Sequence, residues 1–363
     1  MNSKNTPLLR LAKRDDVSKK EAWIIRIAGF VFAIILGGLI FLCMGDNPFT
    51  AYSHIIAGSL GKKVALRQTV KIAVPLLGTA LAIAPCFMMK FWNIGAEGQI
   101  TAGAIGATFF ALNFASSIPS ALLLIIMGLA AAFCGAVWAF FPAFFKSKWQ
   151  TNETLFTLMM NYIVIGLVKW LQGGPWEGKP GSQIIPNFDP SAVLPKVFGI
   201  HCGWIIVLIL VGFMYIYMYR SKHGYELRVV GESHNTARYA GMNITKITIR
   251  TMLLSGAICG LVGFMVASGA NMTLYHSVAD GVGFTAITVA WLAQLNPFAM
   301  IVISFILAIF EKGASTLQTE MAVPASISDI ITGIFLFCLL AAEFFINYKV
   351  IVRKKDDRKE ETK

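Results

Sequence analysis

Long runs without charge limit what this chain can fold into. No charged residue occurs from Ile27 to Gly45 or from Gly98 to Phe145. One soluble core could not hide such runs, whereas a bilayer interior about 30 Å thick accepts about 20 apolar residues per helix. Hydrophobic residues make up 56% of the chain and charged residues 14%, against roughly 25% charge in a typical soluble domain. The sequence therefore predicts a polytopic integral membrane protein.

The spacing of the apolar runs predicts an all-α transmembrane helical bundle of about 10 spans, within a range of 8–10. Each half contains a re-entrant or discontinuous segment, around Asn93–Gln99 and around Gly281–Gln294. Glycine interrupts both segments. Only about 30 uncharged residues separate Asp280 from Glu311, which is short for two full spans. Paired interruptions of this kind often mark a solute path near the middle of the membrane.

The distribution of basic residues predicts how the chain lies in the membrane. The net charge is +12, but Lys and Arg lie at the ends of the predicted spans, which argues against nucleic-acid binding. An even number of spans puts 22 of the 31 Lys and Arg on the side of the termini, and the positive-inside rule makes that side cytoplasmic. The predicted organisation in the cell membrane is an N-terminal tail (1–23), one transmembrane domain (24–347) with an extracytoplasmic loop (172–202) and a cytoplasmic loop (220–249), and a C-terminal tail (348–363).

The segment Asn93–Gln99 places a carboxylate next to deeply apolar sequence. Glu97 needs a partner or water there, because an unpaired charge in the membrane is costly. Asn93 is expected to cap a helix whose first turn contains Glu97, where the helix dipole favours an anion. Two interpretations stay open: an element that lines or gates the pathway, or a purely structural helix start. The predicted pathway residues are Asn93, Gly95, Glu97, Gln99, Phe284, Thr285 and Trp291.

Trp291 lies inside the second interrupted segment rather than at a span end. It could stack on a flat solute ring, or it could serve helix packing, which is the more frequent role of such a residue.

The loop 220–249 is polar, mixed in charge and flanked by two spans. It is expected to hold a short amphipathic stretch with Gly231 as a break. One interpretation is an ordinary basic loop that maintains topology, and the other is a docking helix for a cytoplasmic partner.

Three sequence blocks resemble the simple sugar and nucleoside permeases of ABC importers, a family of branched-chain-amino-acid type. The blocks are FWNIGAEGQITAGAIGA from Phe91, TNETLFTLMMNYI from Thr151 and GYELRVVGESHNTARYAGM from Gly224. Their order and spacing extend the resemblance over about residues 65–345, and it is strongest to purine nucleoside permeases. Trp92 and Thr154 depart from the family's usual residues, and the loop 172–202 is unusually long.

The resemblance implies a transport subunit that moves a small polar solute by alternating access. A nucleoside leads, with simple sugars and riboflavin-like vitamins as alternatives. The implied partners are a cytoplasmic ATP-binding subunit, a second and different permease chain, and an extracytoplasmic solute-binding lipoprotein, all at a lipid membrane. The residues expected to couple to the ATPase are Glu226, Arg228, Gly231, Glu232, Ala237, Arg238, Tyr239 and Gly241.

An enzyme and an ion-driven secondary transporter are the two alternative function classes. No GxxxxGK[ST] motif occurs, so the chain is expected to carry no ATPase site. An enzyme would need clustered His, Asp or Glu at one depth, and the sequence suggests no such cluster, no metal site and no cofactor. An ion-driven secondary transporter would need paired intramembrane carboxylates, for which Glu97, Glu311 and Asp329 are the candidates.

Overall fold

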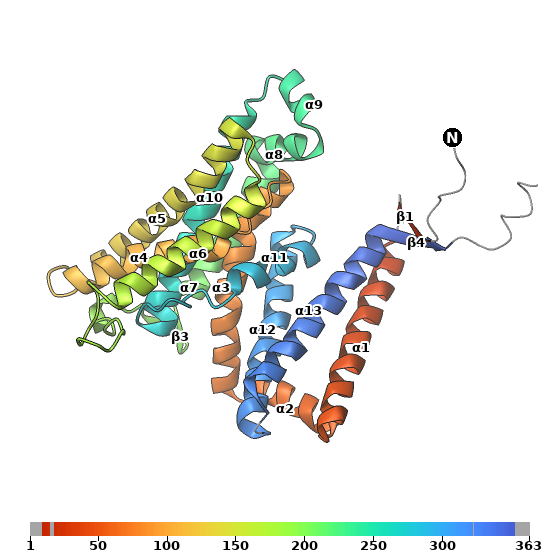
Figure 1. The fold of residues 1–363 in the computed structure, drawn as a ribbon, viewed down its shortest axis with the longest axis horizontal. Coiled ribbons are helices and arrows are strands. Elements are labelled where there is room, and N and C mark those ends of the chain that lie inside the picture. Colours follow the sequence, from red (N-terminus) through yellow and green to blue (C-terminus); the bar gives the residue numbers. More distant parts are fainter. Residues whose placement is uncertain (1–8, 15–17, 322, 353–363) are drawn as a thin grey trace, which may run out of the picture. The chain divides into compact units, whose positions relative to one another are not determined.

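The computed structural model describes residues 9–14, 18–321 and 323–352, so most of the predicted tails (1–8, 15–17 and 353–363) lies outside the described residues. The described residues form two compact units (Figure 1). The first contains the residues up to Ile56 and those from Gly313 onward, and the second is Ala57–Lys312. Helices α2 (Pro48–Leu60) and α12 (Pro297–Glu320) contribute residues to both units.

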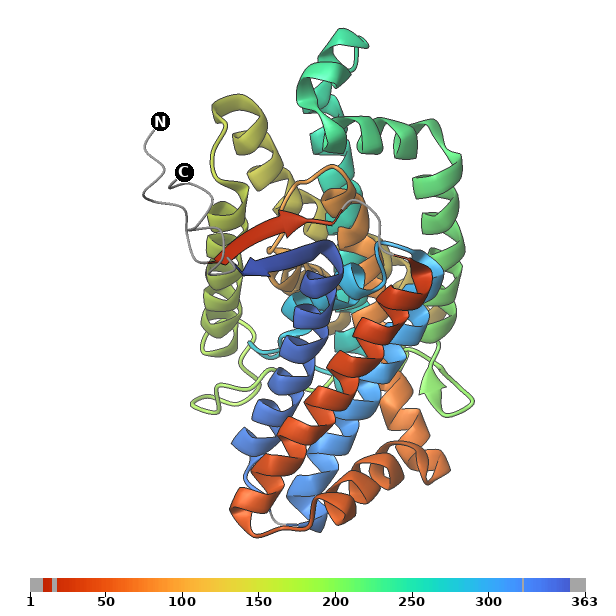
Figure 2. The ribbon, with the colours of Figure 1, turned by 90° about the vertical axis from the view of Figure 1, so that its right-hand side faces the viewer.

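The first unit is built on a pair of long helices, α1 (Lys19–Met44) and α13 (Ala325–Asn347). They lie side by side in both ribbon views (Figure 2). A Cβ on Gly29 would be only 2.6 Å from Ala342 Cβ, so glycine lets the two backbones approach closely. Beyond the helices, β1 (Leu9–Lys13) pairs antiparallel with β4 (Tyr348–Val352). The two ends of the described chain therefore meet in one small sheet.

The second unit carries the central helices. Its elements, in chain order, are α3 (Lys63–Met88), α4 (Ala96–Phe114), α5 (Ser120–Trp149), α6 (Glu153–Gln172), η2 (Pro190–Ala192), β2 (Lys196–Val197), β3 (Ile200–His201), α7 (Gly203–Tyr215) with its π-helical continuation η3 (Ile216–Arg220), α8 (Lys222–Glu232), α9 (His234–Tyr239), α10 (Ile244–Phe264) with its π-helical continuation η4 (Met265–Asn271), α11 (Val282–Leu292) and the start of α12. In the most apolar 18-residue stretch of α3, 83% of the residues are buried, and in that of α10 with η4, 78% are buried. The corresponding share in the other long apolar helices is 22–33%. The core of the unit therefore lies around α3 and α10.

Glycine pairs hold α10 against α4 and α5. A Cβ on Gly260 would be 2.1 Å from the Ala131 carbonyl oxygen, and one on Gly103 would be 2.3 Å from Gly260 Cα. Gly135 and Gly256 approach each other in the same way along α5 and α10. Lipid tails are as apolar as leucine, so membrane helices associate mainly through close van der Waals packing, which small residues permit.

The predicted transmembrane helical bundle is confirmed. Among the described residues, eight helices are long and apolar enough to cross a membrane: α1, α3, α5, α6, α7 with η3, α10 with η4, α12 and α13. Two further helices begin within the predicted interruptions and are not among the eight. They are α4, which carries Glu97 and Gln99 in its first turns, and α11, which has only 11 residues.

Local details differ from expectation in the loop 220–249. It forms two helices, α8 and α9, and the break between them lies at Ser233 rather than at Gly231. Ser233 has an extended backbone, and its hydroxyl accepts the Thr236 N–H at 3.3 Å, which caps α9. Gly231 stays inside α8, where a Cβ would be 2.1 Å from the Met88 carbonyl oxygen. Glycine is needed there for packing, not for a break.

The glycine packing generates a stability prediction. Gly260→Ala should lower the midpoint of thermal unfolding of the detergent-purified protein, because the added methyl group meets the backbone of α5 and overpacking costs about 1–3 kcal/mol. Gly212→Ala is the matched control, since a Cβ on Gly212 meets nothing within 4 Å. Equal midpoints for the two variants would contradict the packing argument.

Candidate functional site

The turn between α3 and α4, residues 89–95, contains a fully buried polar network. The Asn93 amide nitrogen donates to Gln99 Oε1 and to Ser255 Oγ, both at 3.3 Å. Its oxygen accepts from Gln99 Nε2 at 3.2 Å and from the Gly95 N–H at 3.1 Å. The predicted N-cap is therefore wrong by two residues: Gly95 is the N-cap of α4, and Asn93 supports it from the turn.

Helix α6 holds the same turn from the other side. The Asn161 side chain accepts the Gly98 N–H at 2.9 Å and donates to the Ile94 carbonyl oxygen at 3.0 Å. Thr157 Oγ1 accepts the Ile94 N–H at 3.3 Å. A Cβ on Gly98 would be 2.7 Å from Asn161 Oδ1, so the close contact requires glycine. Sequence reasoning did not single out Thr157 and Asn161, although polar side chains in an apolar helix were a usable signal.

Glu97 joins the two interrupted segments. Its side chain is buried, and its two carboxylate oxygens accept the N–H groups of Gly281 and Gly283, each at 2.8 Å. These N–H groups form the N-terminus of α11, where the helix dipole favours an anion. Gly281 has φ +77°, and a Cβ on Gly283 would be 2.4 Å from the Glu97 backbone nitrogen. The contacts favour the structural interpretation of Glu97.

The predicted pathway residues divide by exposure. Asn93, Gly95, Glu97 and Gln99 are buried, and the side-chain bonds above engage the three polar ones. On α11, Thr285 is half-buried and donates its hydroxyl to the Gly281 carbonyl oxygen at 3.3 Å, whereas Phe284 and Trp291 are exposed. Within this set, accessible surface is mainly aromatic.

Three rings cluster beside the turn. Trp92 and Trp291 stack with centroids 5.6 Å apart at 24°, and Phe87 stacks on Trp291 at 5.7 Å and 29°. Phe87 is buried, whereas 46% of Trp92 and 36% of Trp291 are exposed. The sequence did not predict that Trp92 would join Trp291, because about two hundred residues separate them.

The predicted coupling residues lie on α8, on α9 and on the turn after α9. Gly231 and Ala237 are buried anchors, and Glu226 pairs with Arg250 at 2.9 Å. Burial would raise the pKa of Glu226, but the hydrogen bond and charge of Arg250, together with the His223 ring 3.5 Å away, outweigh burial and lower the pKa. The remaining members are exposed, and 93% of Tyr239 is accessible; they are Arg228, Glu232, Arg238, Tyr239 and Gly241.

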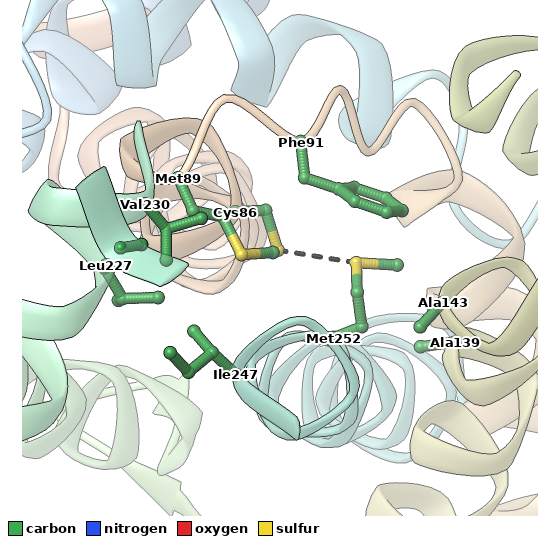
Figure 3. Close-up of a cluster of buried hydrophobic side chains, with 10 residues drawn as sticks. Cys86, Met89, Phe91, Ala139, Ala143, Leu227, Val230, Ile247 and Met252 are labelled. Atoms are coloured by element: carbon green, nitrogen blue, oxygen red, sulfur yellow. Dashed lines mark hydrogen bonds between the residues drawn. The ribbon is translucent and has the colours of Figure 1, made fainter. Parts of the chain in front are cut away.

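A buried apolar cluster attaches α8 to the end of α3 (Figure 3). Leu227 and Val230 of α8 pack with Cys86 of α3 and with Met89 and Phe91 of the turn. Ile247 and Met252 of α10 complete it with Ala139 and Ala143 of α5, and the Cys86 thiol donates to Met252 Sδ at 3.6 Å. Helices α8 and α9 together (Lys222–Tyr239, the α8–α9 segment) therefore rest directly on the residues that lead into the Asn93 network.

A cavity of about 180 Å³ opens beside this cluster. The charged residues of its lining are Lys90, Lys146, Arg238 and Glu153, so cationic side chains dominate. Lys146 and Glu153 pair at 2.8 Å, which leaves the cavity with a net positive lining.

The Glu97 geometry generates a prediction. Glu97→Ala should lower the thermal unfolding midpoint of the detergent-purified protein, because it leaves two helix N–H groups buried without their acceptor, at about 1–3 kcal/mol each. Glu97→Gln, which keeps one acceptor oxygen, should lose less. Glu320→Ala, at an exposed carboxylate, is the control. If Glu97→Ala lowers the unfolding midpoint no more than the control does, the hydrogen bonds from Glu97 to α11 contribute nothing to stability.

Comparisons with known proteins agree with the resemblance of the sequence blocks. A family described as branched-chain amino acid transport system / permease component matches residues 66–340. The glucose ABC transporter permease protein TsgB13 of Haloferax volcanii is 30% identical over 356 residues, which cover 94% of this chain and 93% of that protein. The guanosine ABC transporter permease protein NupP of Bacillus subtilis is 27% identical, with 93% and 99% covered. The nucleoside ABC transporter permease protein NupB of Lactococcus lactis is 25% identical, with 95% and 98% covered. The chain therefore belongs to the family of permease components of branched-chain amino acid transport systems.

Proposed function

We propose that this chain is the membrane-spanning permease subunit of an ABC importer that moves a nucleoside by alternating access, driven by a separate ATPase. The observation that carries the proposal is the α8–α9 segment. Most of its polar side chains are exposed, while its buried face rests on the end of α3 and on the turn 89–95. Such a segment can receive a push from outside the membrane and pass it to a buried turn.

The exposed face of the segment supports docking to an ATP-binding subunit. Arg238 and Tyr239 are exposed at the end of α9, and Ala237, which belongs to the same buried cluster as residues of α8 and α10, anchors that end. The cationic cavity beside Arg238 has the charge and size to accept an acidic side chain of the ATPase. Electrostatic complementarity of this kind would set the register of the two subunits.

A continuous chain of contacts leads from the segment to the pathway residues. Gly231 lies against the Met88 carbonyl oxygen, and Met89 and Phe91 belong to the same cluster as Leu227 and Val230. The turn that follows contains Asn93, and the first turn of α4 contains Glu97, which holds the N-terminus of α11. Movement of α8 would therefore reach α11 through packed groups rather than through solvent.

The membrane orientation follows from the same assignment. We place the loop 220–249, which contains the α8–α9 segment, and both tails (1–23 and 348–363) in the cytoplasm. The loop 172–202 would lie outside. The pairing of β1 with β4 supports a common side for the two tails. Residues 24–347 would act as one transmembrane permease domain in the cell membrane, with a second permease chain and an extracytoplasmic binding protein as partners.

A nucleoside is the proposed solute because two of the relatives named above are nucleoside or guanosine permeases. A simple sugar is the second candidate, favoured by the 30% identity to a glucose permease, and a riboflavin-like vitamin is a further alternative. Ion-gradient coupling is less favoured, since the N-terminus of α11 engages Glu97, a carboxylate that such a mechanism would need to be exchangeable.

Docking can be tested by charge reversal. Arg238→Glu should lower solute-stimulated ATP hydrolysis by the assembled, reconstituted importer by about tenfold, because it removes a cation from the proposed interface and introduces repulsion. Lys179→Glu, in the loop 172–202, is the matched reversal and should leave hydrolysis unchanged. Full hydrolysis by an assembled Arg238→Glu complex would count against the docking role.

Orientation has its own test. In a variant without the native cysteines, His234→Cys should react with a membrane-impermeant maleimide only in inverted vesicles. Gln183→Cys, in the exposed part of the loop 172–202, should react only in intact cells. The reverse labelling pattern would overturn the proposed topology.

A further inference from the structure

Trp92 and Trp291 form a stacked, partly exposed pair beside the turn 89–95. The rings are 5.6 Å apart at 24°, and the buried Phe87 ring supports both, at 5.7 Å from each. Phe87 is 4% exposed, so the pair rests on a fixed base. The spacing leaves no room for a third ring between the two indoles, and a further ring must stack on an outer face. Trp92, at 46% exposed, offers the larger one.

The other predicted pathway groups are committed to the fold. Asn93, Gln99 and Glu97 are buried and bonded to one another or to backbone groups. The exposed members of the predicted set, Phe284 and Trp291, together with Trp92 therefore offer a solute aromatic faces. Aromatic faces bind flat heteroaromatic rings by stacking, which tolerates variation in the ring's edge groups.

We propose that the Trp92–Trp291 pair is a stacking platform for the flat heteroaromatic ring of the transported solute, as in a purine nucleoside. The proposal rests on the proposed importer function and specifies its substrate class. The platform would contribute ring recognition on this subunit, and polar groups of the solute would be bound elsewhere along the path.

The position of the platform also links it to the proposed ATPase contact. Trp92 directly precedes Asn93 and follows Phe91, which belongs to the cluster under α8. Trp291 lies near the end of α11, roughly 12 Å along the helix from Gly283, where Glu97 holds the first turn. A shift of the turn 89–95 relative to α11 would change the overlap of the two indoles. The platform is therefore suited to hold a ring in one state of the cycle and release it in another.

The test uses the assembled importer in liposomes, with guanosine and glucose as probes. Trp92→Leu keeps an apolar side chain but removes the ring, and it should lower ATP-dependent guanosine uptake by roughly tenfold, a loss typical of one stacked base. Trp92→Phe should stay within about threefold of the parent, and Trp291→Leu should resemble Trp92→Leu. Trp170→Leu, at an exposed tryptophan of α6, is the control and should leave uptake unchanged.

The outcomes separate this proposal from the importer function. Parental guanosine uptake by Trp92→Leu and Trp291→Leu would overturn the platform while the importer stands. The same follows if both variants fail to assemble with the second permease chain, since the pair would then be a subunit interface. ATP-dependent uptake of glucose alone, unaffected by either variant, would also overturn the platform. ATP-independent uptake in the parent would instead refute the importer.

Discussion

The hydrogen bonds between the Glu97 carboxylate and the N-terminus of α11 connect the two interrupted segments of this protein. Helix α11 has only 11 residues, too few to cross a bilayer and be positioned by its own length. The carboxylate in turn lies in apolar surroundings, where an unpaired charge is costly. The carboxylate accepts hydrogen bonds from two N–H groups of α11, and the N-terminus of the helix stabilises the carboxylate in return.

The same rule governs the turn 89–95. Irregular backbone away from water needs an internal partner for every polar group, so such a turn survives only when it is buried in protein. Asn93, Thr157 and Asn161 supply such partners from within the unit. Gln99 supports the turn indirectly, through its side-chain bonds with Asn93. Glycine at 95 and 98 lets α6 come close enough to supply them. The polar residues that look like a solute site in a linear sequence are largely the means by which the turn exists.

This arrangement explains why the α8–α9 segment is well placed to act on the membrane part of the chain. It contacts α3 at the point where α3 stops being a helix, through Gly231 and the cluster around Cys86 and Met89. A displacement there need not bend a regular helix. It needs only to shift a turn that is already irregular and that leads within a few residues to Glu97 and Trp92.

The sequence by itself determined the membrane class, the two interruptions and the family. These depend on local properties: the length of uncharged runs, glycine and proline placement, and short motifs. Tertiary structure decided what each polar residue contacts. That Glu97 caps α11, that Asn161 holds the turn, that Gly231 packs instead of breaking a helix and that Trp92 stacks on Trp291 all depend on residues far apart in the chain. The physical reason is that a buried polar group needs a hydrogen-bond partner, and the fold supplies that partner from residues distant in sequence. The spacing of residues along the chain does not show which residues these are.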